Sequence, residues 1–237
     1  MAVVPRGRPW VMRMRWTDLL FAHWPVDPEP LRRQLPAGLE LDLYDGQAWL
    51  GIVPFRMSDV GPRSLPAVPI LSTFPEVNVR TYVRHAERNG VWFLSLDAAS
   101  PLTVVGARLA FHLPYFLADM SIEPRGDGVV YRSQRSRPGE SSAALDMTYR
   151  PTGPVRYAEP GSFEAWSTDR MRLFAADAAG RLSRTEIGHG RWPLQPAEAS
   201  ISTETLSAAA GIELPSVAPH LTFARRLDVR AWWPRSA

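Results

Sequence analysis

The segment FPEVNVRTYV, at residues 74–83, carries four polar side chains at alternate positions. They are Glu76, Asn78, Arg80 and Tyr82, and mostly β-branched residues lie between them. Alternation with a period of two predicts a β-strand whose side chains point to two faces in turn. The polar face offers a proton donor or acceptor on the same side as a guanidinium. This face is either exposed to solvent or part of the wall of a pocket.

In a pocket, Glu76 and Arg80 would have complementary roles. Apolar surroundings raise the pKa of a buried carboxyl toward neutrality, which suits Glu76 to general acid–base catalysis. Arg80 would hold a substrate carboxylate through two parallel hydrogen bonds. Asn78 would orient the substrate, and Tyr82 on the same face would add a further contact. The structural alternative is a salt bridge of Glu76 with Arg80 or with another arginine on the same wall, and the residues alone leave both interpretations open.

Two further candidates lie in the segment HLPYF, at residues 112–116. As a phenol, Tyr115 could donate a hydrogen bond to a carbonyl or enolate oxygen. The alternative is that Tyr115 and Phe116 simply pack, with the hydroxyl bonded to the backbone. His112 is a weaker candidate for substrate binding, because it lies three residues before Tyr115 and can point elsewhere.

The segment GHGRWPLQP, at residues 188–196, places His189 between two glycines and shortly before Trp192. Histidine is the usual acid–base residue near neutral pH. We therefore predict His189 as an acid or base of the pocket and Trp192 as a substrate contact, with a histidine at a loop edge as the alternative. His23, which precedes Trp24 and Pro25, is interpreted as a core histidine bonded to the backbone.

The composition excludes several kinds of catalyst. The chain has 237 residues without a cysteine, and all 27 of its basic residues are arginine. Without lysine, no side chain can form a Schiff base with a carbonyl substrate or with pyridoxal phosphate, and no P-loop lysine is present. The five histidines form no pair at i, i+2 or i, i+4 spacing, so no metal site is predicted. We predict neither a metal nor a cofactor.

Charge and hydropathy argue against two classes of partner. The net charge is +3 and the arginines are scattered, so the sequence predicts no nucleic-acid partner. The N-terminal segment has basic residues but no apolar core of signal-peptide length, and no run of about eighteen apolar residues occurs. We expect a soluble cytoplasmic protein whose partner is a small molecule rather than a membrane.

The elements that must position these residues are short and mostly extended. Strands are predicted over residues 39–43, 47–57, 74–83, 91–98, 117–123, 129–135, 143–150, 181–189 and 221–232. Helices are predicted over residues 28–34, 101–110, 164–176 and 202–210, the first two capped by Asp27 and Ser100. Turns at residues 44–46 and 88–90 each join two of these strands into a hairpin, and residues 58–73 are predicted as a loop.

Many short antiparallel strands with few helices predict an α+β fold built on a curled sheet or barrel. No internal repeat or long linker divides the chain, so residues 1–237 are predicted as one domain.

Six segments together resemble the DUF2071 (YqjF-like) family. They are LLFAHWPV, LPAGLELDLYDGQAWLGIVPFRM, FPEVNVRTYV, VWFLSLDA, ARLAFHLPYFLADM and WPLQPAEA. The resemblance extends over about residues 15–234. The family belongs to the acetoacetate-decarboxylase-like superfamily, so the resemblance implies a β-barrel-like, cone-shaped sheet with helices outside and a pocket inside. Relatives in this superfamily often assemble, which also implies a homo-oligomer whose size the sequence does not fix.

The resemblance fails at the residue that carries the decarboxylase chemistry. In acetoacetate decarboxylases proper, a strand glutamate faces a Lys-Lys pair that follows an aromatic-Pro step. Glu76 resembles that glutamate, whereas Tyr115 and Phe116 occupy the positions of the lysines. The resemblance therefore supports the fold and the pocket interpretation of the polar face. It does not support decarboxylation by an amine.

These observations predict a pocket that binds a small oxo acid or a related carbonyl compound. A lysine-independent step would be enolisation, dehydration, or hydration followed by C–C cleavage. Glu76 would move the proton, Arg80 would hold the carboxylate and Tyr115 would polarise the oxygen. The alternative is a non-catalytic binding or sensing domain that lost the amine. A third hypothesis is a structural subunit whose sheet edge pairs with a second copy.

Overall fold

The computed structural model describes residues 8–64, 73–135 and 141–237. Within these ranges the strands are β1 (Met12–Val26), β2 (Glu40–Leu41), β3 (Ala48–Pro62), β4 (Phe74–His85), β5 (Arg88–Ala98), β6 (Tyr115–Leu117), β7 (Asp119–Arg125), β8 (Gly128–Arg135), β9 (Ala143–Pro151), β10 (Arg172–Ala176), β11 (Leu182–His189), β12 (Leu194–Glu204), β13 (His220–Ala231) and β14 (Arg235–Ser236). The helices are α1 (Pro28–Arg32), α3 (Pro101–Phe111), α4 (Phe163–Thr168) and α5 (Leu206–Ala209).

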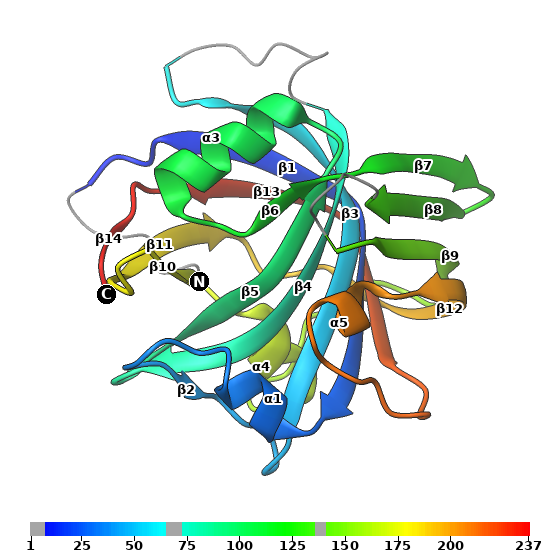
Figure 1. The fold of residues 1–237 in the computed structure, drawn as a ribbon. Coiled ribbons are helices and arrows are strands. Elements are labelled where there is room, and N and C mark those ends of the chain that lie inside the picture. The colour runs from blue at the N-terminus through cyan, green and yellow to red at the C-terminus, as the bar shows by residue number, and fades with distance from the viewer. Residues whose placement is uncertain (1–7, 65–72, 136–140) are drawn as a thin grey trace.

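Seven strands form a curled sheet in the order β11-β10-β5-β4-β3-β1-β13, and β13 pairs back with β11. The strands β12, β9, β8 and β7 continue from β13, and we call these four strands the wing. Figure 1 shows the wing projecting to one side of the curled sheet. The pairs of named strands are antiparallel except β5 with β10 and β5 with β6. The predicted α+β fold with a curled, mostly antiparallel sheet is confirmed.

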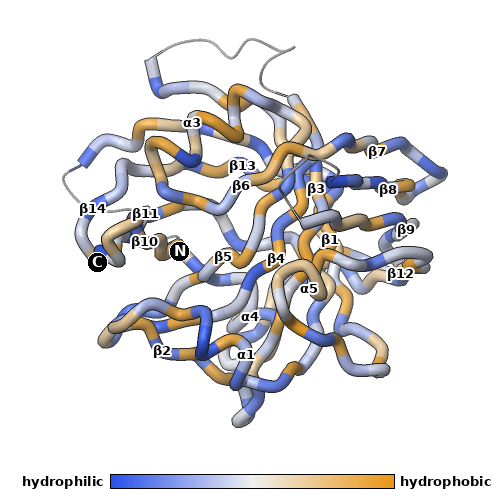
Figure 2. The backbone as a smooth tube through the Cα atoms, viewed as in Figure 1, coloured by the Kyte–Doolittle hydropathy of each residue, from blue (hydrophilic) through white to orange (hydrophobic). Residues whose placement is uncertain are grey.

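The two faces of β4 meet different surroundings. Val77 and Val79 point into a packed core, where they meet wing residues such as Tyr131, Leu145 and Met147. The outer hairpin of the wing, β7–β8, is largely hydrophilic, whereas hydrophobic residues follow the strands of the curled sheet (Figure 2). Because side chains alternate along a strand, the polar face of β4 points away from Val77 and Val79, toward the inside of the curl.

Local signals placed several elements correctly. Helix α1 begins after Asp27, whose Oδ1 accepts a hydrogen bond from the Glu29 N–H at 2.9 Å. Helix α3 begins after Ser100, whose Oγ accepts the Thr103 N–H at 3.3 Å. The β4–β5 hairpin and the strands β7, β8, β9, β11 and β13 lie within a few residues of their predicted positions. These predictions are confirmed.

Other predicted elements were wrong. The predicted hairpin over residues 39–57 does not form, because β2 pairs with β4 and only an isolated Tyr44–Gln47 bridge closes the turn. Strand β3 continues to Pro62, so the first residues of the predicted 58–73 loop are extended. Residues 65–72 of that loop lie outside the described ranges.

Two predicted helices are partly strand. The segment 164–176 is helical only to Thr168, and β10 then pairs with both β5 and β11. The segment 202–210 is strand to Glu204, where β12 pairs with β9, and only Leu206–Ala209 is helical. Strand β1, at the centre of the curled sheet, was not predicted. No helix in the described part of the chain is long and apolar enough to span a bilayer.

Candidate active site

A cavity of about 350 Å³ lies inside the curled sheet, with α3 contributing to its lining. Most of the lining is apolar and comes from β1, β3, β4, β5, β10, β11 and α3. Its large apolar side chains include Met12, Met14, Trp16, Phe21, Phe55, Met57, Phe74, Phe93, Phe111 and Trp192. Its polar side chains include Glu76, Asn78, Arg80, Tyr115, Arg170, Arg172 and His189. The arrangement matches a ligand site with an apolar body and a few polar contacts.

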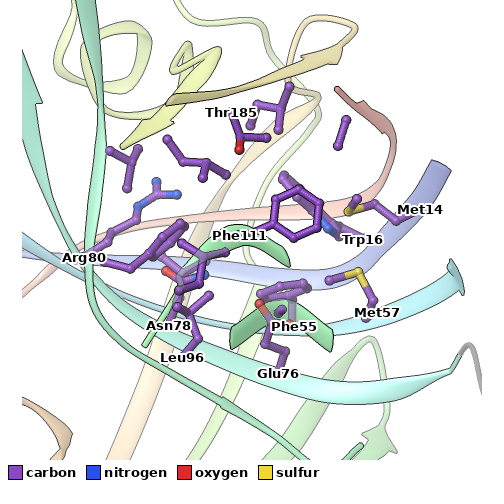
Figure 3. A pocket seen from close by; sticks show the side chains of 18 of the residues that line it. Met14, Trp16, Phe55, Met57, Glu76, Asn78, Arg80, Leu96, Phe111 and Thr185 are labelled. Carbon is purple, nitrogen blue, oxygen red and sulfur yellow. The ribbon is translucent and has the colours of Figure 1, made fainter. Parts of the chain in front are cut away.

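Glu76, Asn78 and Arg80 follow one another along β4 into this cavity (Figure 3). Glu76 and Asn78 are only 2% and 5% exposed. The alternation of β4 explains why these side chains share one face. Three of the four side chains of the polar face, Glu76, Asn78 and Arg80, therefore form part of a cavity wall.

Glu76 is buried against Tyr115, whose hydroxyl donates a hydrogen bond to Glu76 Oε2 at 2.9 Å. Burial raises the pKa of Glu76 from 4.5 to about 8, the negative charge of Asp97 adds to the increase, and the hydrogen bond from Tyr115 opposes it. Burial and the nearby Glu76 carboxyl also raise the pKa of Tyr115 well above its usual value. The pair is therefore neutral at pH 7, with the proton on Glu76.

Arg80 makes contacts that hold it away from Glu76. Its Nε and Nη2 donate to the hydroxyl of Tyr82 at 3.3 and 3.2 Å, and Nη2 also donates to the Ser167 carbonyl at 3.2 Å. Its guanidinium lies over the ring of Phe21 at 5.1 Å. Among the described residues, no carboxylate forms an ion pair with Arg80. The predicted alternative, a salt bridge of Glu76 with Arg80 or another arginine, is wrong for the described residues, among which Glu76 forms no ion pair.

Tyr82 lies behind Arg80 and does not line the cavity itself. Its hydroxyl is 2.5 Å from Nε2 of His23, which is fully buried on β1. Because this hydroxyl accepts from Arg80, its own proton is available for His23. Burial, followed by the positive charge of Arg80, lowers the pKa of His23 well below its usual value, so the ring is a neutral acceptor. His23 is a core histidine as predicted, but its partner is Tyr82 and not the backbone.

His189 lines the cavity from the end of β11, with Trp192 packed edge-on at 5.2 Å. Its Nδ1 is 2.7 Å from the carbonyl of Gly190, which can only accept, so Nδ1 carries the hydrogen. Nε2 therefore keeps its lone pair, and no hydrogen-bond partner for it occurs among the described residues. Burial lowers the pKa of His189, which keeps the imidazole neutral.

The structure places the remaining sequence candidate, His112, outside the cavity. His112 ends α3 in a left-handed conformation (φ 53°) and its side chain is exposed. It borders a separate surface depression with Trp92 and Pro114. The helix end turns the chain there, so His112 and Tyr115 point in different directions although they are three residues apart.

Arg170 lines the cavity and was missed by the sequence analysis. It is 2% exposed, pairs through Nη1 with Asp42, and lies 5.0 Å from the ring centre of Tyr82. Its Nη2 is buried without a hydrogen-bond partner among the described residues. The predicted helix over 164–176 concealed it, because Arg170 lies in the short connection between α4 and β10. In the described part of the chain, no three histidine or acidic side chains group closely enough to hold a metal ion.

Comparisons with known proteins agree with this architecture. The DUF2071 family, described as an uncharacterized conserved protein, matches residues 13–228. The uncharacterized protein YqjF of Bacillus subtilis (strain 168) is 46% identical over 229 residues, covering 97% of this chain and 93% of that protein.

Solved structures of low sequence identity share the fold. The acetoacetate decarboxylase of Legionella pneumophila has a TM-score of 0.66 at 15% identity, covering 99% of this chain and 92% of that chain. The enduracididine biosynthesis enzyme MppR, solved in complex with pyruvate, has a TM-score of 0.66 at 11% identity, covering 99% and 93% of the two chains. The acetoacetate-decarboxylase-like fold implied by the sequence segments is confirmed.

Proposed function

The chain belongs to the DUF2071 family, and we propose that its cavity binds a carboxylic acid that also carries a carbonyl group. We further propose that the protein transfers a proton on this ligand without using an amine. The observation that carries the proposal is the carboxyl of Glu76, which is buried in an apolar cavity, bonded to the Tyr115 hydroxyl and paired with no arginine among the described residues. Acetoacetate decarboxylases reach a related chemistry with lysine, which this chain lacks.

Glu76 is the proposed acid. With a pKa of about 8, it holds its proton in most molecules at neutral pH. A protonated carboxyl can donate a hydrogen bond and then a proton to a carbonyl oxygen as negative charge develops there. The hydroxyl of Tyr115 donates a hydrogen bond to Oε2 of the same carboxyl group. It thus stabilises the carboxylate that remains once the proton has left.

His189 is the proposed base. It lies on β11, three strands from β4 through β5 and β10, so the two groups approach the cavity from different walls. Its neutral ring has a free lone pair on Nε2. A neutral histidine and a protonated carboxyl that line the same cavity are a candidate acid–base pair created by two opposite pKa shifts.

The reaction that this pair supports is enolisation. His189 Nε2 takes a proton from the carbon next to the carbonyl, and the C–H electron pair forms a C=C bond. The carbonyl π electrons move to oxygen, which takes the proton of Glu76. Glu76 is then a carboxylate and His189 an imidazolium, and proton return regenerates both. Arg80 would hold the carboxylate of the ligand, since planar guanidinium groups bind carboxylates in bidentate fashion.

Deuterium exchange tests the proposal directly, because it detects enolisation whatever product is finally released. Oxo acids from pyruvate to 6-oxoheptanoate are incubated with the protein in D2O, and NMR follows exchange at carbons next to the carbonyl. We expect Glu76→Gln and His189→Gln to slow exchange by about 10²- to 10⁴-fold. His112→Gln is the matched control, because His112 is exposed outside the cavity.

Two results would count against catalysis. Exchange by Glu76→Gln at the wild-type rate would remove Glu76 from the reaction. Tight binding of an acid that shows no exchange with the wild-type protein would favour the non-catalytic alternative, a ligand-binding domain with the same cavity.

A further inference from the structure

We propose that the ligand of the cavity is an oxo acid with a bulky apolar group, with about twelve or more non-hydrogen atoms in all. This inference rests on the proposed function and adds the size and chemical character of the ligand. It distinguishes this cavity from one suited to pyruvate or another oxo acid of three or four carbons.

The cavity is large for a small oxo acid. Its volume of about 350 Å³ equals that of roughly twelve water molecules in the liquid, at about 30 Å³ each. Each water molecule contains one non-hydrogen atom, so a ligand that fills the cavity has on the order of twelve such atoms or more. An oxo acid of three or four carbons has six or seven, and it would leave about half of the volume unfilled.

The surface of the cavity that a ligand can reach is mostly apolar. Several apolar side chains of the lining are only partly buried and keep surface open to contact. They are Met12, Trp16, Phe93, Phe111, Leu173 and Ile187. Polar ligand groups would lose their hydration against such a surface without gaining hydrogen bonds, whereas apolar groups bind there favourably.

Water would stabilise the unfilled part of the cavity poorly. A water molecule in a protein cavity requires two to four polar partners. The polar groups of this wall are few, and some already bond to each other or to the backbone. The Tyr115 hydroxyl donates to Glu76, and Arg80 donates to Tyr82 and Ser167. A larger ligand would instead gain hydrophobic and dispersion contacts with the wall.

The arginine of β4 and the methionines of the lining lie at different sides of the cavity. Figure 3 shows Arg80 at one side and Met14 and Met57 toward the other. Trp16, two residues after Met14 on β1, stacks on Trp192 with 5.9 Å between the ring centres. A ligand held at Arg80 by its carboxylate would therefore extend its apolar group toward methionine and tryptophan side chains, which suit bulky groups.

Two acids with the same head group test the size of the ligand. 2-Oxo-4-phenylbutanoate differs from 2-oxobutanoate by a phenyl ring in place of one terminal hydrogen. Isothermal titration calorimetry measures their dissociation constants, and NMR in D2O follows exchange at C3 of each acid. Burial of a phenyl ring corresponds to a factor of about 10 to 150 in affinity. We expect the phenyl acid to bind at least tenfold more tightly.

A variant of α3 tests whether the phenyl ring of the ligand lies in the cavity. Ala107 lines the cavity, so the ring added in Ala107→Phe would take about half of the space for twelve atoms. It should weaken binding of the phenyl acid at least tenfold and that of 2-oxobutanoate less than threefold. Ala110→Phe is the matched control, because Ala110 is exposed on the same helix and does not line the cavity. It should leave both dissociation constants unchanged.

The outcomes separate this inference from the proposed function. Equal affinity for the two acids, or tighter binding of 2-oxobutanoate, would overturn the inference even where exchange occurs. Tighter binding of the phenyl acid without exchange would support it and contradict proton transfer. 4-Phenylbutanoate lacks the oxo group, and its binding as tightly as the oxo acid would support the apolar group and contradict recognition of the carbonyl.

The variants give a second way to overturn the inference. Equal losses of affinity in Ala107→Phe and Ala110→Phe, or no loss in a folded Ala107→Phe, would place the phenyl ring outside the cavity. Thermal melting shows whether each variant folds. The comparison of the two acids with the wild-type protein does not depend on the variants.

Discussion

Glu76 and Asp97 are buried carboxyl groups on neighbouring strands, and they are neutralised in different ways. Asp97, on β5, receives two hydrogen bonds from Arg135 of the wing, one of them from Nε at 3.2 Å. Both side chains of that pair are at most 2% exposed. Glu76, on β4, forms no ion pair among the described residues and has the Tyr115 hydroxyl as its partner.

The difference follows from the two faces of the curled sheet. Asp97 is the cross-strand partner of Val77, which points into the packed core against the wing. There, its ion pair with Arg135 links the curled sheet to β8. Glu76 points into the cavity, where Arg80 is bonded to Tyr82 and Ser167 instead. Asp97 thus stabilises the contact between the curled sheet and the wing, whereas Glu76 keeps a proton that a ligand can receive.

The largest expected effect is the pH dependence that Glu76 gives to the free energy of unfolding. The folded-state pKa of Glu76 is about 8 against 4.5 when exposed, so the folded protein binds one more proton between these values. Its contribution is complete below pH 4.5 and is lost as pH rises through about 8. Relative to Glu76→Gln, wild-type stability should fall by about 1.4 kcal/mol per pH unit, on the order of 5 kcal/mol in total.

Urea unfolding from pH 5 to pH 9 measures this difference. Subtracting the Glu76→Gln curve removes the titration of groups that both proteins share. A pH-independent difference between the two proteins would mean that Glu76 titrates alike in the folded and unfolded states.

Removing the partner of Asp97 should destabilise the fold. Arg135→Met takes away two hydrogen bonds to a buried carboxylate, and such a loss costs about 3 to 5 kcal/mol. Glu76→Gln is the comparison at pH 7, where it replaces one neutral group by another and should cost much less. Urea unfolding at pH 7 measures both. Equal losses in the two variants would contradict the assignment of different roles.

Loss of the Tyr115 hydroxyl should move the pKa of Glu76 further from its ordinary value. The hydrogen bond from Tyr115 stabilises the carboxylate, so Tyr115→Phe should raise the pKa of Glu76 above about 8. A hydrogen bond to a charged group suggests an increase of about one unit. In urea unfolding, the pH above which stability no longer falls would rise by the same amount. A lower pKa in this variant would show that Tyr115 favours the protonated form.

The smallest expected effect concerns the position of Arg80. Tyr82→Phe removes one of the two acceptors that hold its guanidinium, and a lost hydrogen bond of about 1 kcal/mol corresponds to about fivefold weaker binding of an oxo acid such as 6-oxoheptanoate. Tyr131→Phe is the matched control, since the Tyr131 hydroxyl is buried in the packed core without a hydrogen-bond partner among the described residues. Titration calorimetry compares the two. An equal loss in both variants would indicate a general effect of packing.

The sequence predicted the parts of the fold and site that depend on local pattern. The alternation of residues 74–83 placed Glu76, Asn78 and Arg80 on one face, and the capping residues Asp27 and Ser100 marked two helices. The contact between Glu76 and Tyr115 came from the resemblance and not from spacing. No local pattern joins two residues 39 positions apart.

What the sequence could not predict depends on long-range pairing. The helical spacing of residues 164–176 predicted a helix where β10 forms. The strand forms there because β5 and β11 supply partners on both sides. This error also hid Arg170. Tyr82 is excluded from the cavity because it is buried against His23, a contact between distant residues that alternation does not reveal.

The most direct test is the titration of Glu76 itself. Infrared difference spectra between wild type and Glu76→Gln isolate the C=O stretch of the protonated carboxyl as a function of pH. We expect a band that is present at pH 7 and disappears with a midpoint near 8. A band that disappears with a midpoint near 4.5 would mean that Glu76 is a carboxylate at neutral pH, and the proposed acid would be lost.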